Sequence, residues 1–189
     1  MPELPDYTVD PTALVDSSQV GSGTVIWEFV RIMEGAVIGK DCKIGGSCFI
    51  ESGATLGDRV IVKNGSLIWH GVNIGDDVFV GPNVVFTNDL APRVKFLTQA
   101  DEWLETRVEA GATIGAQSTI LSGITIGHNA MIGAGAVVTG DVQDHALVYG
   151  NPATQAGWSC TCGGRLSDTY DCSQCGRTFQ LTSKGLVDV

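Results

Sequence analysis

Two sets of side chains in this 189-residue sequence have types and spacings suited to chemistry. One is a pair, His70 and Asn88, eighteen residues apart. An imidazole can take a proton from an amine near neutral pH, whereas an amide can orient an amine by a hydrogen bond without taking its proton. The other set is four cysteines near the C-terminal end: Cys160, Cys162, Cys172 and Cys175. Whether either set forms a site depends on the elements that position it.

The four cysteines form two close pairs, each followed by glycine and separated by nine residues. This arrangement is typical of zinc knuckles in a rubredoxin-like ribbon, where four thiolates at about 2.3 Å complete a tetrahedral structural site. A module this short cannot bury a core, so the metal would supply much of its folding free energy, on the order of 10 kcal/mol. We expect a zinc-ribbon-like module over residues 158–189, with iron or a redox dithiol as alternatives.

A period of six residues runs through most of the remaining chain. An apolar residue recurs at every sixth position from Val20 to Phe86, and the series resumes from Val108 to Val138. This period fits neither an α-helix nor a long strand, so the chain must turn a corner in every hexad. Three hexads closing a triangle form one coil of a β-solenoid, with coils stacked at about 4.8 Å. The sequence therefore predicts an all-β fold, a parallel β-helix over residues 1–157.

The register predicts which residues stack. Internal columns are expected to contain Ile32, Ile50, Ile68 and Phe86 in one case, and Ile26, Ile44, Val62 and Val80 in another. Beyond an interruption, Val108 should lie above Ile74 and Ile120 above Phe86. Glycine often follows the apolar position, which suits a corner where other residues would be strained. Cys42 and Cys48 fall at small interior positions and are expected to be packing residues.

The interruption, residues 89–107, has no hexad register and is predicted to be a long loop extruded from the solenoid. A loop of this length in a compact repeat is more often functional than idle. It leaves from the corner where the register places His70 and Asn88 on adjacent coils. Polar side chains under a flap, on a rigid scaffold, are expected of a reaction site.

The isoleucine-rich hexapeptide repeat is similar to that of left-handed parallel β-helix acyltransferases, and this family implies the hand of the solenoid. More particular segments, spread over residues 27–158, resemble nucleotide-sugar 3-N-acetyltransferases: residues 27–30 and 62–64, Gly81-Pro82 with Phe86-Thr87-Asn88, Pro92-Arg93, residues 132–138 and residues 150–153 with Gly157-Trp158. Those enzymes acetylate the 3-amino group of a UDP-linked 2-acetamido-3-amino-glucuronate in surface polysaccharide synthesis.

The resemblance implies an acetyl-CoA-dependent N-acetyltransferase with three groups of site residues. Asn88 would aim the amino group, and His70 is a possible base. The nucleotide sugar would contact Glu28, Arg31, Lys63, Asn64 and Arg93. The acetyl-CoA groove would involve Ser122, Gly133, Ala134, Gly135, Asn151 and Pro152. The family also implies a homotrimer with the acyl-donor groove between neighbouring subunits.

Composition limits the possible partners. The formal net charge of −10 argues against nucleic acid or an anionic membrane as the main partner. The absence of a long apolar run or a signal-like N-terminus predicts a cytoplasmic protein without membrane insertion and with reduced thiols.

Three other functions remain to be weighed: a non-catalytic hexapeptide-repeat scaffold subunit, an O-acetyltransferase and a γ-class carbonic anhydrase. The last shares the solenoid but needs three histidines that converge on one metal. His70, His128 and His145 lack the required close spacing.

Overall fold

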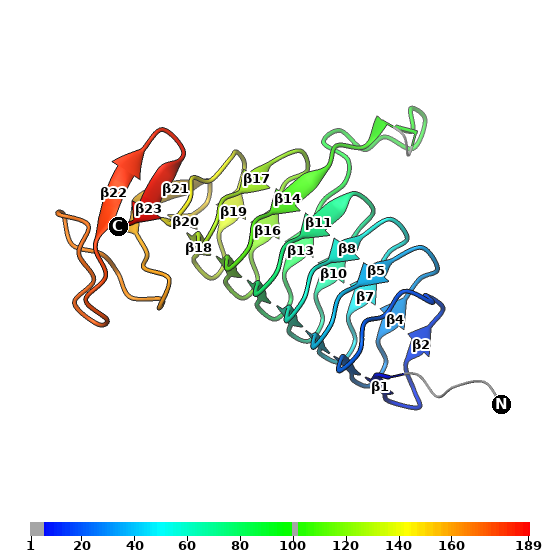
Figure 1. Cartoon of the computed structure of the whole chain (residues 1–189). Coiled ribbons are helices and arrows are strands. Elements are labelled where there is room, and N and C mark those ends of the chain that lie inside the picture. The colour runs from blue at the N-terminus through cyan, green and yellow to red at the C-terminus, as the bar shows by residue number, and fades with distance from the viewer. Residues whose placement is uncertain (1–5, 100–101) are drawn as a thin grey trace.

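The computed structural model describes residues 6–99 and 102–189, which form a parallel β-helix with a small ribbon at its C-terminal end (Figure 1). The first sheet contains β1 (Thr8–Val9), β3 (Val25–Ile26), β6 (Lys43–Ile44), β9 (Ile61–Val62), β12 (Phe79–Val80), β15 (Thr113–Ile114), β18 (Met131–Ile132), β20 (Ala146–Gly150) and β21 (Ala153–Trp158). The second contains β2 (Leu14–Val15), β4 (Arg31–Ile32), β7 (Phe49–Ile50), β10 (Leu67–Ile68), β13 (Val85–Phe86), β16 (Thr119–Ile120) and β19 (Val137–Val138). The third contains β5 (Val37–Ile38), β8 (Thr55–Leu56), β11 (Val72–Ile74), β14 (Thr106–Val108) and β17 (Thr125–Ile126).

Most strands have only two residues, because each corner takes four of every six. The first residue of such a strand points outward and the second is buried. Parallel pairing of β10 with β7 places Ile68 on Ile50, and pairing of β13 with β16 places Phe86 against Ile120. Ile74 pairs with Val108 across the loop. The predicted stacking is confirmed, including the register beyond the interruption.

The corner glycines work differently from the prediction. The residue that adopts a positive φ comes three places after the buried strand residue, as at Phe29, Gly53 and Asp77. The glycine directly after the strand meets a steric limit instead: a Cβ on Gly39 would lie 2.3 Å from the carbonyl oxygen of Gly57 on the next coil. This glycine allows the stacked backbones to approach closely. The prediction that it relieves backbone strain at the corner is therefore wrong for this position.

A Gly39→Ala substitution is therefore expected to lower the free energy of unfolding by about 1–3 kcal/mol, because neither backbone can move without disturbing the stack. Gly140→Ala is the matched control, since a Cβ there meets no atom within 4 Å. Urea unfolding of the two variants measures the difference. Equal stability of both would contradict this role of the glycine ladder.

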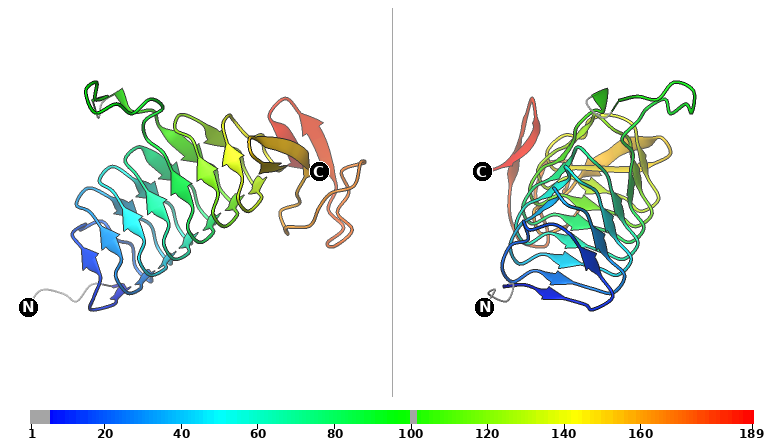
Figure 2. Two further views of the ribbon diagram at one scale, coloured as in Figure 1. Left: turned by 180° about the vertical axis from the view of Figure 1, so that it is seen from behind. Right: turned by 90° about the vertical axis from the view of Figure 1, so that its right-hand side faces the viewer.

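The described parts of the extruded loop, residues 87–99 and 102–105, lie between β13 and β14 and project from the side of the solenoid near the middle of its length (Figures 1 and 2). β14 begins at Thr106, so the predicted loop end at residue 107 is two residues too late. Thr106 and Arg107 pair with β11 because the ladder resumes before the hexad pattern does. The loop exposes large apolar side chains, with Val94 92% and Phe96 79% exposed.

The ribbon covers the C-terminal end of the solenoid. It contains the hairpin β22 (Phe179–Thr182) and β23 (Gly185–Asp188) and has its own buried cluster. β21 continues through the predicted boundary at residue 157, and Trp158 packs against both cores. The ring of buried His145 lies 4.9 Å from that of Phe179. The structure contains no helix, within its described residues, that is long and apolar enough to cross a bilayer.

Candidate active site and metal centre

His70 and Asn88 lie at the same corner on adjacent coils. This second corner, between the second and third sheets, contains residues 33–36, 51–54, 69–71, 87–99, 102–105 and 121–124. The pairing of Leu67 with Val85 aligns the strands that precede the two residues. Both side chains are half-buried. The structure thus brings the two predicted catalytic residues to the root of the extruded loop.

The ring of His70 is held in one tautomer. Nδ1 lies 2.8 Å from the carbonyl oxygen of Ser52, which can only accept, so in the neutral ring Nδ1 carries the proton and Nε2 is left as an acceptor. The backbone N–H of His70 donates to Oε2 of Glu51 at 2.8 Å. A Cβ on Gly53 would lie 2.4 Å from Nδ1, so glycine there makes room for the ring.

The loop folds back over this corner. The ring of Trp103 meets that of His70 edge-on, with centroids 5.7 Å apart. Leu104 lies over Gly123, where a Cβ would be 2.7 Å from its Cδ1. Trp103 therefore belongs to the candidate site, although its position could not be predicted because the loop has no hexad register.

Ser122 also lies at the second corner, apart from the other residues predicted to bind acetyl-CoA. It is 3% exposed, and its backbone N–H donates to the hydroxyl of Thr87. Among the described residues, its Oγ is the buried side-chain polar atom without a hydrogen-bond partner. The structure does not place Ser122 in one groove with Gly133, because the two residues follow strands of different sheets.

The remaining predicted cofactor residues follow the first sheet. The first corner, between the first and second sheets, contains residues 27–30, 45–48, 63–66, 81–84, 115–118 and 133–136. Ala134 and Gly135 are exposed there, and a Cβ on Gly135 would meet no atom within 4 Å. Asn151 and Pro152 lie exposed at the turn between β20 and β21. This edge thus offers small side chains and open backbone for an extended ligand.

A cavity of about 350 Å³ lies beside the N-terminal coils of the first corner. Three of the predicted substrate residues line it: Glu28, Lys63 and Asn64. Trp27, Lys43 and Phe79 complete its polar and aromatic walls and were not predicted. Lys43 and Phe79 occupy the outward position of β6 and β12, a position for which the hexad pattern predicts no residue type.

The two predicted arginines lie outside this cavity. Arg31, on the outer face of the second sheet, forms an ion pair with Asp16. Arg93 is exposed on the loop, and its Nη1 donates to the carbonyl of Pro92 at 3.3 Å. Neither lines the cavity with Glu28, Lys63 and Asn64, so the predicted substrate residues do not form a single set on one chain.

The predicted site residues consequently lie on two edges of one sheet. The first corner carries the cavity and the exposed small residues Ala134 and Gly135, whereas the second corner carries His70 and Asn88 beneath the loop. One hexad of extended chain separates adjacent corners, a span of up to about 20 Å. A single chain does not bring the polar corner against its own Ala134 and Gly135.

The four predicted cysteine ligands converge in the ribbon. Their sulfur atoms all lie within 4.8 Å of one another, including Cys160 and Cys175 at 3.5 Å and Cys162 and Cys172 at 3.6 Å. Tetrahedral ligation at about 2.3 Å needs sulfur separations of about 3.8 Å, so the donor set fits one metal ion. Gly163 and Gly176, which follow the two pairs, both have positive φ and turn the chain back under the sulfurs.

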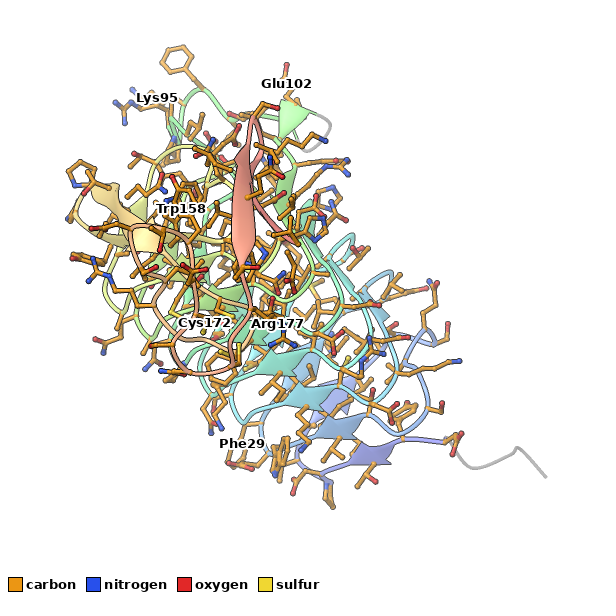
Figure 3. All side chains as sticks on the ribbon, turned by 60° about the vertical axis from the view of Figure 1, so that its left-hand side comes forward. Phe29, Lys95, Glu102, Trp158, Cys172 and Arg177 are labelled. Carbon is orange, nitrogen blue, oxygen red and sulfur yellow. The ribbon has the colours of Figure 1, made fainter. Side chains whose placement is uncertain are left out.

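Arg177 lies beside this sulfur cluster (Figure 3). Its Nη1 donates to Sγ of Cys175 at 3.3 Å, and its Nε lies 3.3 Å from a carboxylate oxygen of Asp188. The backbone N–H of Arg177 lowers the pKa of Cys175 to about 6, whereas burial raises the pKa of Cys160. In the described part of the chain this is the group of cysteine, histidine or acidic residues placed to hold a metal, and its members are all cysteines.

Repeat, coil geometry and site together define a hexapeptide-repeat transferase. The family model for bacterial transferase hexapeptide repeats matches residues 17–52, 53–88 and 105–140, and a model of the hexapeptide repeat of succinyl-transferase matches residues 35–70. The chain belongs to the bacterial transferase hexapeptide family.

Individual relatives within this family show which proteins the chain is similar to. The chain is 47% identical over 182 residues, 95% of its own length and 93% of the relative's, to a dTDP-3-amino-3,6-dideoxy-alpha-D-galactopyranose 3-N-acetyltransferase of Aneurinibacillus thermoaerophilus. It is 33% identical over 142 residues to bifunctional protein GlmU of Brevibacillus brevis, covering 74% of this chain but 28% of that protein. The acetyltransferase domain of PglB from Neisseria gonorrhoeae, solved with acetyl coenzyme A, has a TM-score of 0.50 at 26% identity, covering 80% of this chain and 55% of that one.

Proposed function

We propose that the protein is an acetyl-CoA-dependent N-acetyltransferase that acts on the amino group of a nucleotide-linked amino sugar in surface polysaccharide synthesis. The observation that carries this proposal is the 47% identity, over nearly the full length of both chains, to an enzyme that acetylates a dTDP-linked 3-amino sugar. That relative's substrate has the 3-amino group that the sequence resemblance implies, on a dTDP-linked rather than a UDP-linked sugar. Because acetyl-CoA and reduced thiols belong to the cytosol, we place the reaction there.

In the proposed reaction the neutral amine attacks the thioester carbonyl, a C–N bond forms and the C–S bond breaks. The amine loses one proton and the departing thiolate of CoA gains one, so the step needs no external acid or base in sum. Asn88 orients the amine, and Nε2 of His70, free because Nδ1 is bound to Ser52, accepts and passes on the proton. Glu51 holds the backbone of His70, and Gly53 leaves room for its ring.

The separation of the two corners supports a homotrimer in which each site is shared. In a cyclic arrangement the second corner of one copy can face the first corner of the next, which places Asn88 opposite the groove of Ala134 and Gly135. An inert scaffold would not need the positioned imidazole or the extruded loop. We further propose that the four ribbon thiolates hold a structural Zn²⁺ that takes no part in the reaction.

A screen of nucleotide-linked amino sugars with acetyl-CoA, monitored by release of free thiol, tests the function. We expect turnover with a 3-amino sugar linked to UDP or dTDP and none with the corresponding 3-hydroxy sugar. Turnover on the hydroxyl compound would favour an O-acetyltransferase. If no sugar is acetylated and neither CoA nor acetyl-CoA raises the melting temperature, the protein is a scaffold and the proposal is wrong.

A further inference from the structure

The hydroxyl of Ser122 at the second corner is not explained by the packing of the solenoid. Ser122 is 3% exposed, and its Oγ has no hydrogen-bond partner in residues 6–99 and 102–189, although most buried polar groups have one. We propose that Ser122 is a positioning residue for Asn88: in the reaction its Oγ accepts a hydrogen bond from Nδ2 of Asn88 and turns Oδ1 of that amide toward the amine. This inference rests on the proposed function, because it explains how the residue that aims the amine is itself held.

The strand register places Asn88 and Ser122 at equivalent positions on adjacent coils. Phe86 of β13 pairs with Ile120 of β16 (Figure 1), and Asn88 and Ser122 each follow these residues by two positions. The backbone N–H of Ser122 donates to Oγ1 of Thr87 at 3.0 Å, which ties the two coils together beside this column. Because paired strands are spaced at about 4.8 Å, the two side chains are within reach of a hydrogen bond.

Asn88 lacks the supports that fix His70. The imidazole of His70 donates to the carbonyl of Ser52, and its backbone N–H donates to Glu51. Among the described residues, the amide of Asn88 takes part in none of the side-chain hydrogen bonds of this corner. A group that aims a reacting atom must be held within about 0.5 Å and about 10–20° of its productive geometry. Asn88 therefore needs a partner that is itself fixed.

Ser122 meets this requirement because its surroundings are held from both sides. The N–H of the next residue, Gly123, donates to Oγ1 of Thr106 at 3.2 Å, and Leu104 lies over Gly123. A ligand could reach the buried Oγ of Ser122 only by displacing its cover, whereas Asn88 stands one coil away in the same column. The position therefore favours Asn88 over acetyl-CoA as the partner of this hydroxyl.

The proposed bond decides which way the amide of Asn88 faces. An asparagine amide has an acceptor, Oδ1, on one side and a donor, Nδ2, on the other. A neutral amine that attacks a thioester keeps its lone pair for the carbonyl carbon and offers its N–H groups to neighbours, so the group that aims it must be an acceptor. With Nδ2 bound to Oγ of the buried Ser122, Oδ1 faces outward to accept from the amine.

Kinetics and thermal melting of the full-length protein test this role together. We expect Ser122→Ala to lower kcat by about 10- to 100-fold, with KM and CoA affinity unchanged, because the amine is bound but badly aimed. The double variant Ser122→Ala/Asn88→Ala should be no slower than Asn88→Ala alone, since the two residues act as a unit. The melting temperature of Ser122→Ala should not fall, because the hydroxyl that it removes has no partner in the free protein.

Ser17→Ala is the matched control. Ser17 lies in the same column on the first coil, is 5% exposed, and donates from Oγ to the carbonyl of Ala36 at 2.6 Å. Its replacement removes a hydrogen bond that is made, so we expect the melting temperature to fall by about 2–4 °C and kcat to match wild type.

Four results would overturn the inference. They are an unchanged kcat in Ser122→Ala, additive losses in the double variant, a melting temperature of Ser122→Ala that falls at least as far as that of Ser17→Ala, and a loss of CoA affinity, which would assign the hydroxyl to the acyl donor. Failure of the proposed function looks different, because wild type itself would then acetylate no amino sugar and the inference would be refuted with it. An active wild type matched by Ser122→Ala would refute the inference alone.

Discussion

Replacement of Asn88 by alanine is expected to lower kcat by about 100-fold or more and to leave the affinity for CoA unchanged. The half-buried amide lies at the root of the loop, on the coil next to His70, and the proposed role is to aim a neutral amine at the thioester. Orientation of a reacting group can contribute several kcal/mol to a barrier, and each 1.4 kcal/mol changes a rate tenfold. Steady-state kinetics with thiol detection, together with calorimetric CoA binding, measures both quantities.

The companion variant His70→Ala separates the two roles. Loss of a general base lowers a rate by about 10²–10⁴-fold, so kcat should fall here too. His70→Ala also leaves the backbone carbonyl of Ser52 without its imidazole partner. Ser52→Ala changes the packing beside the ring but keeps this hydrogen bond, so it serves as the packing control. If His70→Ala alone abolishes turnover, and Asn88→Ala turns over normally with unchanged sugar binding, the assignment of Asn88 is wrong.

A mixing experiment tests whether the site is shared between chains. Asn88→Ala damages the second corner, and Ala134→Trp fills the groove of the first. If each site takes one corner from each of two neighbours, random mixing of the two inactive variants in a ring restores about a quarter of the sites. Recovery of activity after co-refolding would show this, whereas a site contained in one chain would give no recovery.

The solenoid was predictable because its core follows a strict rule. Every inward position repeats at six residues, so the stacking of Ile68 on Ile50 and of Val108 on Ile74 follows by counting. The same count places His70 and Asn88 at one corner. Counting does not show why glycine follows the buried strand residue. At Gly39 a side chain would collide with the backbone of Gly57, whereas the residues with positive φ lie two positions further along the chain.

The residues that line the cavity could be predicted only in part from the buried hexad positions. Glu28, Lys63 and Asn64 were predicted from their motifs, but Lys43 and Phe79 occupy outward strand positions, which the buried register leaves unconstrained. The hexad register nevertheless places the outward residues of β6 and β12 on the same face of the solenoid, two coils apart. Counting could therefore have predicted that the Lys43 cation and the Phe79 ring lie on one face. The loop gives less information, since Trp103 reaches His70 through a segment without any period.

The ribbon carries the second large expected effect, which comes from its size. Its own buried cluster contains few residues, two of them cysteines of the sulfur site, so hydrophobic burial alone supplies little folding free energy. Structural Zn²⁺ contributes on the order of 10 kcal/mol in such modules. Removal of the proposed Zn²⁺ is therefore expected to unfold residues 160–189 and leave the solenoid folded.

Hydrogen exchange can separate the two parts within one molecule. The amides of Cys172, Gly176 and Phe179 donate to backbone carbonyls inside the ribbon, at 2.8, 2.9 and 3.1 Å. We expect Cys172→Ser, or wild type treated with a strong chelator, to lose zinc and the protection of these amides. The buried strands of the solenoid should remain protected. Cys48→Ala is the control, since its sulfur lies in the solenoid core and should not affect zinc content.

Zinc binding to the four cysteines is expected to depend on pH in one direction. All four thiols must lose their protons to bind the metal, so binding releases protons and weakens as the pH falls. The Cys175 thiol, with a pKa of about 6, is largely ionised at neutral pH, whereas burial favours the neutral form of Cys160 and makes it the thiol whose proton the metal must displace. Retention of ribbon protection after complete removal of zinc would show that packing on the solenoid end, through contacts such as His145 with Phe179, suffices to fold the module.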